Sequence, residues 1–364
     1  MRRAEGVIGL LALSTLAAGI VSAGAVEPTK KAAPAAAPVV EAKVVEPVPT
    51  PSRSPAAKPA PTPRRTTVPA TALGPAPPLT GCPVPKRTTP PRPPKPLPAP
   101  IVAEAALPAP LPVRAKATDL SVVHGKGLWA TPFGKKPVDV AGLVAQARAT
   151  DVRAIWIRTG GSRQGYYGNQ FLPALVPAAH AAGIKVIAWD FPFLSDPVAD
   201  ARRAGLAFAA GVDAFSPDVE TVAEGTRLTT RRLSLYLSMV RSYAGQRAVI
   251  ATVPRPSSAR KSYPYAAFRP YADVFAPMVY WSCFEPGSVT QASIAKLRGL
   301  LPVAPVGQGY DMGAEGGRRG TPSRAETLRF LDAARHAGAL GASLWTVEEA
   351  GPAQLGALRD YRWR

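Results

Sequence analysis

The sequence has few of the side chains that hold metals or act as nucleophiles. Its 364 residues include only three histidines and two cysteines. His124, His180 and His336 form neither an H-x-H nor an H-E-x-x-H spacing, so we do not expect a catalytic zinc site or a histidine-based triad. Cys82 and Cys283 lie far apart and belong to no C-x-x-C pair, which excludes the usual zinc and redox motifs. We therefore predict no metal and no cofactor.

Nucleotide and nucleic-acid signatures are also missing. The glycine-rich stretches 160–161 and 313–317 fit neither a P-loop nor a dinucleotide fingerprint, and we interpret them as loops at strand ends. The chain carries a formal net charge of +20. Its basic residues are scattered, and no expected helix shows a Lys/Arg stripe. We therefore predict no nucleic-acid partner.

Long hydrophobic runs are scarce, and the one clear example lies near residue 1. Met1-Arg2-Arg3 is followed by an apolar run over 7–21 and then by Ala23-Gly24-Ala25. This is the three-part layout of a secretory signal peptide. We predict a signal peptide over residues 1–25 and a secreted or cell-envelope location. The run is short for a membrane span of about 20 residues, so membrane attachment is expected only if the segment stays as an uncleaved anchor.

The next segment is rich in proline. Residues 1–118 hold 26 of the 43 prolines and few aromatic residues. Such a composition cannot bury enough apolar surface to offset the entropy of ordering the chain. We predict that residues 26–118 form a disordered linker. Two alternatives remain for the cysteines: a disulfide between Cys82 in the linker and Cys283 in the following domain, or two unpaired thiols.

Residues 119–364 show a repeating pattern. Short runs rich in β-branched and aromatic residues alternate with amphipathic segments, which is typical of parallel β-α units. Eight such units in about 250 residues favour a closed barrel. The prediction is an α/β fold with a single, monomeric (β/α)8 TIM-type barrel. The expected strands are 127–133, 152–159, 184–191, 212–220, 248–254, 274–281, 303–310 and 341–347.

Asp218 and Glu220 are the most informative residues at the strand ends, where such barrels place their active sites. Two residues apart on one strand, their side chains point to the same face, about 6.6 Å apart. If Val219 faces the helices, both carboxylates face the barrel mouth. Coupling between them raises the pKa of one, which could then donate a proton near neutral pH. Cleavage of a glycosidic bond requires such a donor.

Aromatic and polar residues end several other expected strands. Sugar rings stack on flat apolar faces, while their hydroxyls bond to charged and amide groups. An alternative is that one or two of the aromatic residues only pack the barrel core. The predicted substrate-binding residues are Trp129, Arg158, Trp189, Asp190, Trp281, Gln308, Tyr310 and Trp345.

Three segments resemble the chitinase-type glycoside hydrolases (family eighteen). The run 213–220, D-A-F-S-P-D-V-E, is similar to the strand-four signature D-x-x-D-x-D-x-E. Met278-Val279-Tyr280 resembles the strand-six motif M-x-Y, and Trp345 fits the strand-eight tryptophan. A lysozyme-type family (family twenty-five) also carries D-x-E at strand four. It has a strand-one aspartate, which 127–131 lacks.

The family-eighteen resemblance implies roles for three residues. Glu220 would be the general acid, and Asp218 would orient the substrate acetamido group that Tyr280 contacts. The implied mechanism is substrate-assisted, without a covalent enzyme intermediate. The chain departs from the pattern at Ser216 and Trp281, where the family has aspartates.

Two functional hypotheses follow. The first is an exported glycoside hydrolase acting on a cell-envelope or environmental polysaccharide, such as a peptidoglycan-type glycan. The second is a non-catalytic glycan-binding barrel tethered in the envelope by its linker, which the departures at Ser216 and Trp281 motivate. A third, weaker alternative makes the linker itself a scaffold for a partner protein.

Overall fold

The computed structural model describes Cys82 and most of residues 101–363. The predicted signal peptide over 1–25 lies outside the described residues, as does the predicted linker before residue 101 apart from Cys82. The described residues are Cys82, 101–113, 115–117, 119–132, 137–259 and 262–363.

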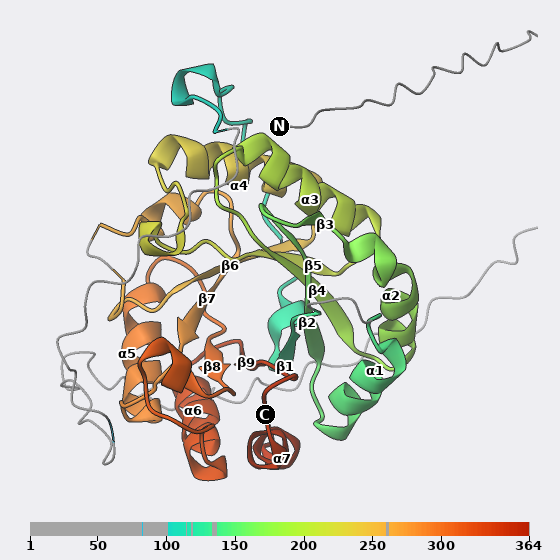
Figure 1. The fold of residues 1–364 in the computed structure, drawn as a ribbon, viewed down its shortest axis with the longest axis vertical. Coiled ribbons are helices and arrows are strands. Elements are labelled where there is room, and N and C mark those ends of the chain that lie inside the picture. Colours follow the sequence, from blue (N-terminus) through green and yellow to red (C-terminus); the bar gives the residue numbers. More distant parts are fainter. Residues whose placement is uncertain are drawn as a thin grey trace, which may run out of the picture. The chain divides into compact units, whose positions relative to one another are not determined.

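Eight parallel strands form a closed barrel, which confirms the predicted α/β fold (Figure 1). The strand order is β1-β9-β8-β7-β6-β5-β4-β2, and the pairing of β2 with β1 closes the sheet. The two-residue strand β3 adds to β2 in the antiparallel direction. The strands are β1 (Gly125–Ala130), β2 (Ala154–Gly161), β3 (Gly165–Tyr166), β4 (Lys185–Phe191), β5 (Ala214–Pro217), β6 (Ala248–Pro254), β7 (Val274–Val279), β8 (Val306–Gln308) and β9 (Gly341–Trp345).

Helices surround this ring of strands (Figure 1). Most begin at a side chain that accepts a hydrogen bond from the first turn, such as Asp196 before α3 and Ser323 before α6. Gly183 and Gly211 follow α2 and α3 with φ of 70° and 90°, a conformation that favours glycine and ends each helix. Between β6 and β7 the described chain forms only a 3₁₀ helix, η5 (Tyr265–Phe268). The α-helices are α1 (Val140–Ala149), α2 (Leu172–Ala181), α3 (Pro197–Ala209), α4 (Thr230–Ala244), α5 (Pro286–Leu297), α6 (Arg324–His336) and α7 (Pro352–Asp360).

Buried side chains form two layers of core. The outer layer lies between the strands and the helices, and includes Phe215, Val219 and Phe330. The inner layer fills the barrel itself. Its largest members are tryptophans, and Trp129 stacks on Trp156 with ring centroids 4.6 Å apart. The barrel is therefore a packed core, and its chemistry is confined to the mouth.

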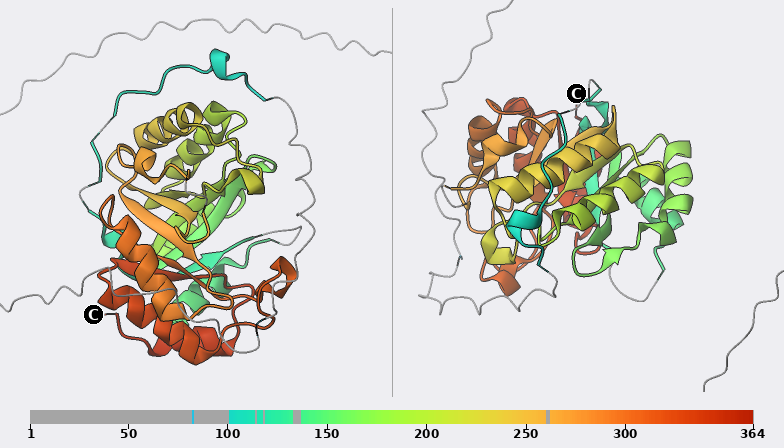
Figure 2. Two further views of the ribbon diagram at one scale, coloured as in Figure 1. Left: turned by 90° about the vertical axis from the view of Figure 1, so that its left-hand side faces the viewer. Right: turned by 90° about the horizontal axis from the view of Figure 1, so that it is seen from above.

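The described residues of 101–117, which we call the strap, pack against the barrel. This corrects the predicted linker boundary at residue 118. Figure 2 shows the strap running along α4. Leu107 is buried, and the Ala117 N–H donates to the Asp273 carboxylate at 3.1 Å. The Arg232 guanidinium donates to the Val102 carbonyl. Composition could not reveal these contacts, because they depend on partners more than 100 residues away.

None of the helices in the part of the chain that the structure describes combines the length and the apolar character that a bilayer span requires.

Candidate active site

A cleft of about 670 Å³ opens at the carboxyl ends of the strands. Six residues predicted for the site from the sequence line it together: Trp129, Asp218, Glu220, Tyr280, Tyr310 and Trp345. The structure therefore brings together the predicted acid, its neighbouring carboxylate and most of the predicted aromatic contacts. The other described lining residues are Thr221, Ala223, Glu224, Thr252, Pro254, Arg255, Ser258, Met278, Met312 and Glu315.

Strand β5 ends at Pro217, earlier than predicted, but the chain stays extended beyond it. Asp218 forms an isolated bridge with Thr252 of β6. Val219 is fully buried in the outer core, and its carbonyl accepts a hydrogen bond from the Tyr263 hydroxyl at 2.6 Å. Val219 thus faces the helices as expected. Asp218 and Glu220 on either side of it both line the cleft.

Burial alters the acidity of both carboxyl groups. Asp218 is 5% exposed, and its Oδ1 has no hydrogen-bond partner among the described residues. Desolvation raises the pKa of Asp218 to about 7, against the opposing charge of Arg158. Desolvation also raises the pKa of Glu220 well above its usual range, and the charges of Asp218, Glu224 and Glu315 add to this effect. Both groups can therefore hold a proton near neutral pH.

Two tyrosines form one wall of the cleft. The rings of Tyr280 and Tyr310 meet edge to face with centroids 5.4 Å apart. The Tyr310 hydroxyl donates to Glu315 Oε2 at 3.0 Å. Burial raises the pKa of Tyr280 well above its usual range. The Tyr280 hydroxyl therefore stays protonated and can donate a hydrogen bond to a bound ligand.

Tryptophans form the floor. Trp345 and Trp129 both line the cleft, with ring centroids 5.5 Å apart. Trp345 is half-buried, whereas Trp129 is 1% exposed and its indole N–H donates to Ser343 Oγ at 2.8 Å. Trp189 lies beneath them, 5.1 Å from Trp345, and donates to the Ala130 carbonyl. Trp345 presents most of the aromatic surface, while Trp189 supports it from below.

Five of the eight predicted substrate contacts need correction, because their side chains do not line the cleft: Trp189, Trp281, Gln308, Asp190 and Arg158. Trp281 is fully buried and packs on Phe330 of α6, with centroids 5.5 Å apart. It directly follows Tyr280, and successive side chains of an extended chain point to opposite faces. Gln308 is also buried, and its amide is fully engaged: Oε1 accepts from the Ser282 N–H and Nε2 donates to the Tyr310 carbonyl. Neither side chain lines the cleft.

Asp190 and Arg158 lie behind the cleft wall. Asp190 is fully buried and forms an ion pair with Arg203, which also contacts Asp200 at 2.9 Å. The Arg158 guanidinium lies over the Trp189 ring, 5.1 Å from its centroid. Neither residue lines the cleft, yet the charges of both act on the pKa of Asp218. Their place is behind the reactive groups, where they influence Asp218 electrostatically.

The strand-four motif departs from the family pattern at Ser216 and keeps its first aspartate at Asp213. Ser216 is fully buried, and its hydroxyl donates to the Ile250 carbonyl at 2.7 Å and lies 2.7 Å from Thr252 Oγ1. This hydroxyl links β5 to β6 where the family has a carboxylate. Asp213, the first residue of the motif, lies at the opposite end of the strand and binds Lys185 and His180. Asp213 is therefore structural.

Three charged residues that line the cleft were not predicted from the sequence: Glu224, Arg255 and Glu315. Glu224 and Glu315 belong to the loops after β5 and β8, and Arg255 directly follows β6. Loops carry no periodic signal. Glu224 could still have been found, because Thr221-Val222-Ala223-Glu224 is a capping box, and its Thr221 N–H donates to Glu224 Oε2 at 3.1 Å. Among the described residues, no group of three His, Cys, Asp or Glu side chains could hold a metal ion.

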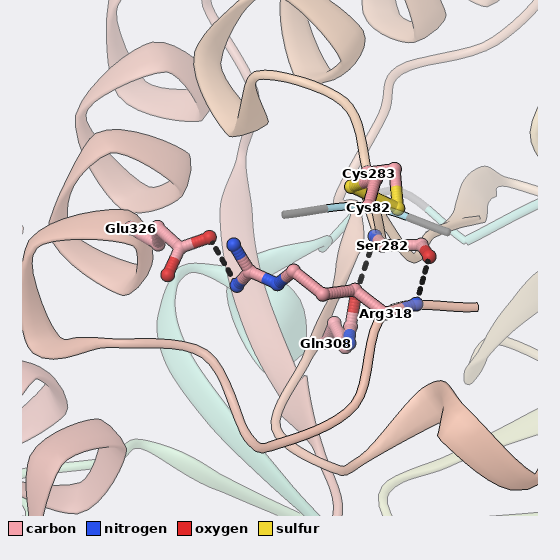
Figure 3. Close-up of a disulfide and its surroundings, with 6 residues drawn as sticks. All are labelled: Cys82, Ser282, Cys283, Gln308, Arg318 and Glu326. Carbon is pink, nitrogen blue, oxygen red and sulfur yellow. Dashed lines mark hydrogen bonds and ion pairs between the residues drawn. A yellow bond between two sulfur atoms is a disulfide. The ribbon is translucent and has the colours of Figure 1, made fainter. Parts of the chain in front are cut away.

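A disulfide joins Cys82 to Cys283 beside the site, which settles the two alternatives for the cysteines (Figure 3). Their Cα atoms are 5.6 Å apart. Cys283 lies in the loop after β7. The neighbouring Ser282 accepts a hydrogen bond from the Arg318 N–H at 3.0 Å, and Arg318 forms an ion pair with Glu326 of α6. The loop beyond Tyr280 is thus held by the disulfide at Cys283 and by the hydrogen bond at Ser282.

The comparison with solved structures supports the fold. No protein-family model matches the chain, and no curated protein matches its sequence. Among solved structures, the chitinase from Chromobacterium violaceum ATCC 12472 matches with a TM-score of 0.51 and 12% identity, over 66% of this chain and 100% of that one. The Bacillus cereus spore cortex-lytic enzyme SleL matches with a TM-score of 0.50 and 9% identity, over 65% and 73%. The barrel resembles those of the chitinase-type glycoside hydrolases, as the strand motifs predicted.

Proposed function

We propose that this protein is a glycoside hydrolase. The observation that supports this best is the pair Asp218 and Glu220, two carboxyl groups with raised pKa values in one open cleft. A protonated carboxyl group beside a second carboxyl group suits the cleavage of a glycosidic bond. The half-exposed Trp345 and the Tyr280–Tyr310 wall offer faces on which sugar rings can stack.

The roles follow from the family-eighteen resemblance and the local electrostatics. Glu220 donates its proton to the glycosidic oxygen as the bond to the anomeric carbon breaks. The substrate acetamido oxygen forms the new bond to that carbon, held in place by Asp218 and the Tyr280 hydroxyl. Glu220, now ionised, then accepts a proton from the water that opens this cyclic intermediate.

The proposed substrate is a polysaccharide with N-acetylated sugars, such as a peptidoglycan-type glycan of a cell envelope. The two structural neighbours are named a chitinase and a spore cortex-lytic enzyme, which accords with this class. The signal-like segment over 1–25 suits a secreted or envelope location. We propose that the protein acts as a monomer.

Glu220→Gln tests the proposal, with Glu224→Gln as the matched control. Both variants remove a carboxylate from the same cleft. The Glu224 side chain is hydrogen-bonded to Thr221 and acts on Glu220 through its charge, so Glu224→Gln should lower turnover much less than Glu220→Gln. Reducing ends released from chitin and from peptidoglycan are measured, together with glycan binding. Glu220→Gln is expected to lower turnover at least about 100-fold while binding persists. Full activity in Glu220→Gln would exclude Glu220 as the acid.

A non-catalytic glycan-binding barrel is the second candidate. Ser216 supports it, because its hydroxyl is hydrogen-bonded within the barrel where the family has the middle aspartate. This candidate predicts glycan binding without any release of reducing ends from the wild-type protein. Release that depends on Glu220 would rule it out.

A further inference from the structure

Arg255 stands apart from the other charged groups of the cleft. The remaining charged side chains among the described lining residues are the carboxyl groups of Asp218, Glu220, Glu224 and Glu315. Arg255 directly follows Pro254, the last residue of β6, and its carbonyl accepts hydrogen bonds from the N–H groups of Ser258 and Ala259 at 3.0 Å. Its backbone is therefore fixed at the end of a barrel strand.

The guanidinium of Arg255 has no anionic partner among the described residues. Its Nη1 is buried there without a hydrogen bond. The buried arginines of the described barrel all have partners: Arg203 pairs with Asp190 and Arg241 with Asp273, while Arg232 donates to backbone carbonyls. Burial lowers the pKa of Arg255, and no acidic neighbour offsets this effect. A partly buried cation that lines an open cleft without a counter-ion is suited to pair with an anionic ligand group.

A ring orients this cation. The Arg255 guanidinium carbon lies 5.1 Å from the centroid of the Phe284 ring, and Phe284 is 41% exposed. An aromatic ring under a guanidinium holds its plane and leaves its edges available for two parallel hydrogen bonds to a carboxylate. Phe284 directly follows Cys283, so the disulfide fixes this support.

We infer that Arg255 binds a carboxylate carried by the glycan, so that the substrate is an acidic polysaccharide. This inference rests on the proposed function, since it names the substrate class of the same cleft. The carboxyl groups elsewhere in the cleft disfavour a ligand anion, and so the charged sugar binds in the register that brings its carboxylate to Arg255. A uronic acid and a lactyl ether on an N-acetylated sugar both supply this group.

The test compares Arg255→Gln and Arg255→Lys with a matched control, Arg163→Gln. Arg163 also lies over a phenylalanine, 5.0 Å from the Phe193 centroid, but it is exposed and does not line the cleft. The substrates are peptide-free peptidoglycan strands with free lactyl carboxylates, the same strands with those carboxyls reduced to alcohols, a uronic-acid polysaccharide, and uncharged chitin oligosaccharides. Thermal melting checks that each variant is folded.

Arg255→Gln is expected to lower kcat/KM on the carboxylate strands by about 10- to 100-fold, and by less than about twofold on the reduced strands. Arg255→Lys keeps the positive charge but cannot make two parallel hydrogen bonds to a carboxylate, so its kcat/KM on the carboxylate strands should lie between those of the wild type and Arg255→Gln. Arg163→Gln should leave kcat/KM unchanged on both the carboxylate and the reduced strands. Comparing the loss on the lactyl strands with the loss on the uronic-acid polysaccharide identifies which sugar supplies the carboxylate. Equal losses on charged and reduced strands, or no loss on either charged glycan, would overturn the inference.

Binding separates this inference from the proposed function. Calorimetry measures the binding of carboxylate strands and of the uronic-acid polysaccharide to Glu220→Gln and to the double variant Glu220→Gln/Arg255→Gln. This measurement does not depend on turnover. If wild-type protein releases no reducing ends but the double variant binds a carboxylate glycan at least about tenfold more weakly, hydrolysis is refuted and the Arg255 site stands. Equal binding of both charged glycans by the two variants would refute the site.

Discussion

At the residue scale, Asp218 shows how function works against stability. It is buried with an unpartnered carboxyl oxygen, and its neighbours include the carboxyls of Asp190 and Glu224. Folding would be favoured by an uncharged group at this position. A carboxyl group there makes sense if it holds a substrate, because a bound ligand would supply the missing hydrogen bond.

Asp218→Asn should therefore stabilise the protein, increasingly as the pH rises. The folded-state pKa of Asp218, about 7, lies above the ordinary value of 3.8. Between these values the folded state holds a proton that the unfolded state has lost, so wild-type stability falls with rising pH by at most about 1.4 kcal/mol per unit. Asparagine does not titrate. The variant's advantage in unfolding free energy should grow by roughly 2–3 kcal/mol between pH 5 and pH 7.

Urea denaturation of both proteins at pH 5, 6 and 7 measures this difference. Asp196→Asn serves as the control, since Asp196 caps α3 away from the cleft. An advantage of Asp218→Asn that stays constant or shrinks with pH would contradict the raised pKa of Asp218.

The direction of a side chain could be predicted from the sequence where the alternation of side chains along an extended strand determines it. Alternation around Val219 gave the shared orientation of Asp218 and Glu220. The same rule, applied to Tyr280, would have placed Trp281 on the opposite face. Gln308 was beyond prediction, because its amide is used by Ser282 and Tyr310, whose proximity arises only from the fold.

At the element scale, the strand-helix alternation could be predicted because each unit follows local rules. Side-chain caps begin most of the helices, and glycines such as Gly183 and Gly211 end two of them. Strand ends were less predictable. β8 covers only Val306–Gln308 rather than 303–310. Its late start accords with Pro305, which lacks the N–H group that a longer ladder requires. The loops that bring Arg255, Glu224 and Glu315 into the cleft carry no such signals.

The disulfide is the element-scale feature with the clearest energetic consequence. Cys82 and Cys283 are 201 residues apart in sequence. A cross-link of that span restricts the unfolded chain and is expected to add up to about 5 kcal/mol to the unfolding free energy. Reductant should therefore lower the melting temperature of the wild-type protein. The double variant Cys82→Ser/Cys283→Ser should melt at that lower temperature with or without reductant.

Thiol titration in denaturant, before and after reduction, shows whether the bond is present. An unchanged melting temperature after complete reduction would mean that the bond adds no stability.

At the scale of the whole molecule, the folded domain begins earlier than the sequence indicated. The proline content predicted a disordered linker up to residue 118. Proline content alone cannot show where the strap contacts the barrel. The strap depends on Arg231 and Arg232 of α4, which bind the Leu107 and Val102 carbonyls. The barrel itself was predictable, since it follows from eight local units; the strap was not, because only distant residues stabilise it.

Leu107→Ala tests whether the strap is part of the folded domain. Leu107 is 4% exposed, and truncating a buried leucine is expected to lower the unfolding free energy by about 2–4 kcal/mol. Val113→Ala is the matched control on the same strap, because Val113 is 56% exposed and should change stability by less than about 0.5 kcal/mol. Equal, negligible effects of both variants in urea denaturation would show that the strap adds nothing to the fold.

The proton-donor role of Glu220 is tested most directly by varying the leaving group. Wild-type and Glu220→Gln proteins are compared on aryl N-acetylglucosaminides, one with a phenyl and one with a dinitrophenyl leaving group. A poor leaving group needs a proton, whereas dinitrophenolate leaves without one. If Glu220 is the proton donor, Glu220→Gln should lose at least about 100-fold in rate on the phenyl glycoside and much less on the dinitrophenyl glycoside. Equal losses on both substrates would contradict this role.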